Sequence, residues 1–299
     1  MKYLDPKADL TFKKVFGEHP DLVISLLNAL LPFNTPEEEI MSVEYLPAEL
    51  VPENPLRKNS IVDVRCRDAR GRQFIVEMQM IWSPEFEQRV LFNAAKAYVR
   101  QLDGGEDYRL LEPVYSLNLV NEVYESGMQE YYHYYRLVHD RHTEKVIEGL
   151  HLVFVELPKF TPRTYSEKRM QVLWLRYLTE INEDTREVPA ELLGNPDIRK
   201  AITQIEESAF TKAQLYSYEK FWDTISVEKT LFNSGKREGR AEGEAIGLEK
   251  GCAEGEAIGL EKGEAIGLMK TALRMREEGC SDSFIAQMTG LTEEQIREL

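Results

Sequence analysis

Two carboxylates and an amide interrupt otherwise apolar residues in the stretch from Ile61 to Met80. Asp63 follows two apolar residues, and Glu77 and Gln79 lie within the sequence FIVEMQM. Carboxylate oxygens are the ligands that hard divalent cations such as Mg²⁺ prefer, and bound Mg²⁺ activates water and stabilises the charge that develops at a phosphodiester. The residue types therefore suggest a hydrolytic metal site, with Asp63 and Glu77 as metal ligands and Gln79 beside them. The polar side of an exposed edge hairpin is the alternative explanation.

A β-hairpin would bring these three side chains together. The tetrapeptide DARG at 68–71 suits a type I turn, and a left-handed Gly71 would extend it to a three-residue loop with a bulge. That loop places Asp63 opposite Glu77. Because side chains alternate along a strand, Gln79 lies on the same face as Glu77, so the polar groups converge. A tighter loop would shift the pairing by one residue.

Basic residues crowd the same hairpin. The segment 57–72 carries six arginines or lysines and two aspartates, in a chain whose net charge is −15. Arginine binds phosphate through paired hydrogen bonds, so Arg65 and Arg67 are candidate DNA contacts, as is Lys13 on the first predicted helix. Charges that keep an exposed strand edge from pairing explain the same pattern. Asp9 and Lys13 suit the edge of the site, and also a helix cap and a solvated lysine.

The composition excludes several classes of protein. The 299 residues are 42% hydrophobic and 10% aromatic, enough to bury a large core, and the absence of a run of about 18 apolar residues predicts no membrane span. The acidic net charge argues against a nucleic-acid coat protein, whose affinity depends on a basic surface. Three widely spaced cysteines without a CxxC motif predict neither a disulfide framework nor a zinc site, and they fit the reducing cytoplasm.

The remaining pattern predicts a mixed α/β sheet with flanking helices. Apolar residues at helical spacing predict two helices within 9–31, the second beginning at Pro20, and a third over 83–102 that Ser83 caps. Strands are predicted near 42–46, over 110–121 and twice within 131–161, and residues 163–232 are predicted to be helical.

Other residues of reactive type are less specific. Gln88 and Tyr98 fall near one face of the third predicted helix, where they either touch substrate or pack. Cys66 alternates to the face opposite Asp63 and is predicted to lie in the core. Four histidines are each predicted to be surface or hydrogen-bonded residues rather than metal ligands: His133, His139, His142 and His151.

The tail has a different pattern. Glycine recurs at every fourth position from Gly235 to Gly267, and GEAIGLEK occurs twice, at 243–250 and 255–262. Each glycine costs a helix about 1 kcal/mol, but small residues at this spacing allow another backbone to approach closely. The segment is therefore either a self-associating helix, which would make the protein a homo-oligomer, or a flexible linker.

The last residues, 281–299, have the spacing of a helix-turn-helix. Ile285 and Leu291 would fill the space between two short helices. The second helix, TEEQIREL, is acidic and would be repelled by phosphates. A packing or dimerisation unit is therefore favoured over a DNA-reading unit.

These motifs together resemble a known family. The hairpin IVDVRC…FIVEMQM is similar to the core motif of the PD-(D/E)XK nuclease superfamily, and more narrowly to that of the recombination-promoting nuclease or putative transposase family of bacteria. The similarity spans roughly residues 4 to 230. Four further stretches carry it: DLTFKKVFG at 9–17, SLLNALL at 25–31, QRVLFNAAKAYVRQL at 88–102 and FVELPKF at 154–160.

The resemblance implies a restriction-endonuclease-like fold and magnesium-dependent cleavage of DNA, in recombination, mobile elements or phage defence. Asp63 and Glu77 would be the metal ligands, and Gln79 stands where the superfamily usually has Lys. Glutamine can orient water but brings no charge to the phosphate, so a catalytically silent assembly module is the alternative. The implied organisation is a nuclease-like domain at 1–230, a glycine-repeat segment at 231–270 and a small helical terminus at 271–299.

Overall fold

The computed structural model describes residues 2–50, 60–162 and 169–299. The first residues of the basic segment 57–72 and residues 163–168 of the predicted helical region lie outside this description. The chain divides into two compact units, Met1–Lys229 and Thr230–Leu299, and each is described by itself.

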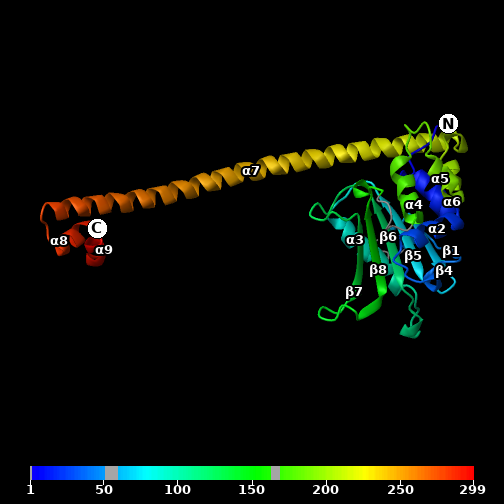
Figure 1. The fold of residues 1–299 in the computed structure, drawn as a ribbon, viewed down its shortest axis with the longest axis horizontal. Helices are drawn as coiled ribbons and strands as arrows, with labels where there is room; N and C mark the ends of the chain where they lie inside the picture. Colours follow the sequence, from blue (N-terminus) through cyan, green and yellow to red (C-terminus); the bar gives the residue numbers. More distant parts are fainter. Residues whose placement is uncertain (1, 51–59, 163–168) are drawn as a thin grey trace. The chain divides into compact units, whose positions relative to one another are not determined.

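The first unit is built on the predicted mixed sheet, whose six strands lie in the order β1-β4-β5-β6-β8-β7 (Figure 1). The central pairs, β5 with β6 and β6 with β8, are parallel, and the outer pairs are antiparallel. A central parallel strand is covered on both faces, and every residue of β6 except Tyr115 is buried, Ser116 and Asn118 included. The strands are β1 Val43–Tyr45, β4 Val64–Asp68, β5 Gln73–Gln79, β6 Val114–Val120, β7 Tyr132–Val138 and β8 Val146–Glu156, and β2 Glu49–Leu50 and β3 Ser60–Ile61 form a separate pair.

Helix α3, Glu85–Val99, packs on one face of the sheet (Figure 1). Ala94 and Ala97 of this helix are fully buried in a cluster with Ile75 of β5. The predicted side-chain cap is wrong, because Ser83 accepts the Phe86 N–H with its carbonyl oxygen at 2.9 Å and the helix begins only at Glu85.

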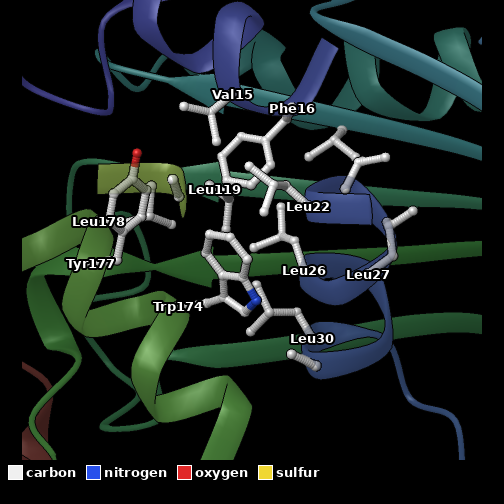
Figure 2. Packing of buried hydrophobic residues seen from close by; sticks show 14 of the residues in the cluster. Val15, Phe16, Leu22, Leu26, Leu27, Leu30, Leu119, Trp174, Tyr177 and Leu178 are labelled. Carbon is white, nitrogen blue, oxygen red and sulfur yellow. The ribbon is translucent and has the colours of Figure 1, made fainter. Parts of the chain in front are cut away.

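The opposite face carries the main core. In Figure 2, Leu22, Leu26 and Leu30 of one helix lie along one side of the Trp174 ring of another, with Leu119 of β6 near the ring. A fully buried tryptophan makes many van der Waals contacts and contributes heavily to core stability. The helices of this face are α2 Pro20–Leu30, α4 Arg169–Glu180, α5 Ala190–Gly194 and α6 Pro196–Gln204.

The N-terminal segment forms two helical pieces, as predicted. Helix α1, Asp9–Phe12, runs into a π-helical turn, Lys13–Gly17, and Pro20 begins the next helix. Phe12 and Phe16 point into the main core, whereas Lys13 remains partly exposed. Single π-helical turns inside helices occur often at functional sites.

The hairpin between β4 and β5 has the predicted register. Gly71 adopts the left-handed conformation with φ +89°, and Arg67 pairs with Gln73 and Val64 with Val76. The same count places Asp63, just before β4, opposite Glu77. A three-residue loop therefore closes the hairpin, and the tighter alternative is wrong.

The second unit is helical. The glycine repeat belongs to α7, Lys212–Glu277, and a Cβ added at any of its nine glycines would meet no atom within 4 Å. Two short helices follow, α8 Asp282–Thr289 and α9 Glu293–Arg297. Ile285 is buried in a small hydrophobic cluster between them, and Leu291 packs against this cluster, as predicted. None of the helices in the described ranges combines the length and hydrophobicity that crossing a membrane requires.

Candidate active site

Asp63 is fixed by the neighbouring strand. Its Oδ2 accepts a hydrogen bond from the backbone N–H of Met78 at 2.8 Å. Burial raises the pKa of Asp63, and this hydrogen bond together with the charge of Lys13 opposes the rise. The carboxylate is thus held in one orientation in a poorly hydrated place, where a cation would be its best remaining partner.

Glu77 lies deeper, with 6% of its surface exposed. Its Oε1 accepts a hydrogen bond from Asn93 Nδ2 of α3 at 3.2 Å. Burial, and next the charge of Asp63, raise the pKa of Glu77 to about 7. A buried carboxyl group whose pKa is raised further by a neighbouring carboxylate is typical of a site that binds a cation or moves a proton.

The donor set fits a hard divalent cation. Within the described ranges, no group of three or more His, Cys, Asp or Glu side chains could hold a metal, so the protein would supply Asp63 and Glu77 and leave the other positions to water, backbone carbonyl or substrate oxygens. Mg²⁺ is commonly bound in this way, through one or two carboxylates. Asn93 Oδ1 is also buried without a hydrogen-bond partner, and a water molecule on a bound ion would satisfy such an acceptor.

Gln79 lies at the end of β5, and both ends of its amide are engaged. Its Nε2 donates to the carbonyl oxygen of Ile81, and its Oε1 accepts a hydrogen bond from Arg89 Nη2 at 2.6 Å. Arg89 belongs to α3, so Gln79 connects the strand of the site to the helix that covers it.

Two cations act on the carboxylates. The charges of Lys13 and Arg89 lower the pKa of both Asp63 and Glu77. Lys13 is itself in an ion pair with Asp9 at 2.5 Å. Asp9 therefore pairs with a lysine and lies in the first turn of α1, whose N-cap residue is Ala8.

Arg65 and Arg67 lie farther along β4. Arg65 is partly buried and its Nη2 donates to Gln73 Oε1 at 2.8 Å. Arg67 forms an ion pair with Glu44 of the edge strand β1, about 13 Å along the strand from Asp63 at about 3.3 Å per residue. The charge of Lys13 thus acts on both carboxylates, whereas these two arginines lie along the hairpin.

The other residues of reactive type lie in different environments. Gln88 is exposed, whereas Tyr98 packs against the cluster under α3. Cys66 is fully buried in the main core, as predicted. Each histidine in the strand region has a ring nitrogen near an acidic side chain. His133 is hydrogen-bonded to Glu156. The ring nitrogens of the others lie near carboxylate oxygens: His139 at 3.3 Å from Asp140, His142 at 3.4 Å from Glu144 and His151 at 2.9 Å from Glu148.

Sequence reasoning missed Asn93 and Arg89. They are four residues apart on α3, so they project from the same side of the helix. Asn93 was detectable in principle, because it is a polar residue within the buried face of Val90, Ala94 and Ala97. Such a residue normally has a hydrogen-bond partner, and here that partner is Glu77.

A mixed sheet that holds Glu77 on β5 opposite Asp63, just before β4, under a helix that adds an arginine, defines a nuclease-like α/β protein. The chain belongs to the family described as PD-(D/E)XK nuclease family transposase, whose model matches residues 6–228. The matched range includes the six-stranded sheet and the whole site, and it confirms the resemblance. Comparison with curated proteins and with solved structures gave no match.

Proposed function

We propose that this protein is a magnesium-dependent DNA endonuclease that acts in the cytoplasm, in recombination, mobile elements or phage defence. The observation that supports it best is the pair of carboxyl groups at Asp63, which is partly buried, and Glu77, which is buried, both with raised pKa values. Membership in a nuclease and transposase family implies DNA as the substrate. The reaction class is hydrolysis of a phosphodiester bond.

The residues of the site have distinct parts in this proposal. Asp63 and Glu77 would hold a divalent cation, which when bound supplies an activated water and neutralises charge at the phosphate. The hydrogen bonds from Met78 and Asn93 keep the two carboxylates in place. Lys13 would contact a phosphate of the DNA, and Arg65 and Arg67 would contact the backbone farther along the hairpin.

Nicking of a supercoiled plasmid tests the proposal. The wild-type protein is expected to nick the plasmid with Mg²⁺ and to stop when the metal is chelated. Asp63→Ala and Glu77→Ala should each lower the rate by more than about 100-fold, because several kcal/mol of charge stabilisation are lost and each 1.36 kcal/mol is tenfold in rate. Glu85→Ala, an exposed residue in the first turn of α3, is the matched control and should cleave normally.

Two outcomes would contradict the proposal. If circular dichroism shows all variants folded and they all nick equally, the activity lies elsewhere. If the wild type is inert with every divalent metal, the protein is not a nuclease. A catalytically silent assembly module is then the better proposal, and the lack of charge on Gln79 favours it.

Self-association through the glycine-repeat segment is also proposed. In this segment of α7 the residues between the glycines include exposed apolar side chains such as Ile246, Leu248, Ile258 and Leu260. Glycine leaves room for a second helix to approach closely. Size-exclusion chromatography with light scattering should give a multiple of 34.6 kDa. Replacing Gly247, Gly251, Gly255 and Gly259 with leucine should give monomers whose helix content is no lower than that of the wild type, and a monomeric wild type would refute the proposal.

A further inference from the structure

Arg89 differs from the other cation near the carboxylates in having no acidic partner. Lys13 is neutralised by Asp9 at 2.5 Å. Among the residues that the structure describes, Arg89 forms no ion pair, and Gln79 is its hydrogen-bond acceptor. Arg89 therefore contributes a net positive charge beside the two carboxylates.

The guanidinium is held from two sides. Gln79 Oε1 accepts from Nη2 at 2.6 Å, and the guanidinium carbon lies 4.8 Å from the centre of the Phe86 ring, a distance at which the cation is attracted to the ring face. The donor end of the Gln79 amide is bonded to the Ile81 carbonyl, which fixes the orientation of the acceptor. Arg89 is thus positioned in advance rather than free in solvent.

Most of the hydrogen-bond donors of the Arg89 guanidinium are not used within the described part of the protein. The guanidinium carries five N–H groups, and one hydrogen bond to Gln79 uses only one of them. The residue is exposed, so the other donors face solvent. A planar fork of this kind matches the oxygens of a phosphate, where it forms paired hydrogen bonds.

The charge acts on the site from this position. Gln79, which accepts the hydrogen bond from Arg89, lies two residues from Glu77 on the same face of β5. The guanidinium therefore lies at the edge of the carboxylate site, and its charge opposes the rise in the pKa of both Asp63 and Glu77. Arg65 and Arg67 are engaged instead with Gln73 and Glu44.

We propose that Arg89 contacts the phosphate that is cleaved and stabilises its developing negative charge, and that Gln79 positions Arg89 for this contact. The proposal rests on the nuclease function proposed above. In this proposal Gln79 needs no charge of its own. Arg89 of α3 supplies the positive charge, and Gln79 of β5 holds Arg89 in position. Positive charge aimed at the transition state is among the largest contributions to catalysis.

Kinetics of plasmid cleavage with Mg²⁺ test the proposal. Arg89→Ala should lower kcat about 100-fold, with a smaller change in KM, because the contact matters most when charge develops. Arg109→Ala is the matched control, since Arg109 is an exposed arginine paired with Asp107, and it should cleave normally. Thermal melts of each variant check that the fold is retained.

A second substitution separates a chemical role from a structural one. Gln79 Oε1 lies within hydrogen-bond distance of the guanidinium, so a lysine at position 79 would bring an ammonium to nearly the same place. Gln79→Lys in the Arg89→Ala background should therefore recover at least about tenfold of the lost rate.

Three results would overturn the proposal. The first is an Arg89→Ala variant that cleaves like the wild type, which would leave the nuclease function standing. The second is a loss that appears only in KM, which would make Arg89 an ordinary DNA contact. The third is an inert wild type, which would remove the nuclease function and this role together.

Discussion

Replacing Glu77 with Gln is expected to raise the stability of the metal-free protein at about pH 8 by about 3 kcal/mol, because a shift of one pKa unit corresponds to about 1.36 kcal/mol. Burial and the charge of Asp63 raise the pKa of Glu77 from 4.5 to about 7 in the folded protein. As the pH rises from 4.5 to about 7, the unfolded chain therefore loses this proton first and is stabilised relative to the folded protein. Glutamine has no proton to lose, so the variant escapes this penalty.

Urea unfolding across this pH range, with the metal chelated, measures the effect. Below pH 4.5 the carboxyl is protonated in both states and wild type and variant should differ little; the difference should grow up to about pH 7 and then level off. Glu85→Gln, at an exposed position of α3, should show no such growth. A stability difference that is constant with pH would contradict the burial of an ionisable group at this position.

Magnesium near saturation should reverse the order of stability. A ligand that binds only the folded protein stabilises it by about 2.7 kcal/mol at a hundred times its Kd and by about 4.1 kcal/mol at a thousand times. Mg²⁺ at about a thousand times its Kd should therefore make the wild type the more stable protein at about pH 8 and leave Glu77→Gln unchanged. The same variant should not cleave DNA. A more stable but inactive protein is the pattern expected when a residue is retained for function at a cost in stability.

The local part of the site could be predicted from the sequence. The DARG turn and the left-handed Gly71 determine the register, and the register alone places Asp63 opposite Glu77. Turn chemistry and side-chain alternation act over a few residues, so they can be deduced without the rest of the fold. The start of the second helix at Pro20 could be predicted for the same reason, because a proline at the first helical position is a local signal.

The rest of the site depends on how α3 is rotated on the sheet. Val90, Leu91 and Phe92 are consecutive apolar residues, so the pattern does not decide which face is buried; in the structure Val90 is buried and the other two are exposed. That rotation turns Asn93 toward Glu77 and Arg89 toward Gln79. Packing against distant strands determines this rotation, and the run of consecutive apolar residues does not specify it.

The second large effect is expected outside the catalytic site, at Glu156. This residue ends β8 and is fully buried. Its carboxylate accepts hydrogen bonds from Lys159 Nζ at 2.7 Å, from His133 Nε2 at 2.9 Å and from the Tyr124 N–H at 3.1 Å. Lys159 also donates to backbone carbonyls of the loop that precedes β7, those of Glu125, Met128 and Glu130.

Glu156 and Lys159 belong to the stretch FVELPKF that contributed to the family resemblance. Their contacts give the motif a structural explanation, because the ion pair ties the loop before β7 to the end of β8. Breaking a buried pair by removing one partner leaves an uncompensated charge. Glu156→Gln is therefore expected to destabilise the fold by about 3–5 kcal/mol, measured by urea unfolding.

A double variant distinguishes the lost charge from lost packing. Glu156→Gln combined with Lys159→Met removes both charges, and because replacing both partners costs less than removing one, it should be more stable than Glu156→Gln alone. Glu148→Gln, whose carboxylate is 59% exposed and faces His151, should change stability by less than about 1 kcal/mol. If Glu156→Gln is as mild as this control, the buried pair does not hold the loop.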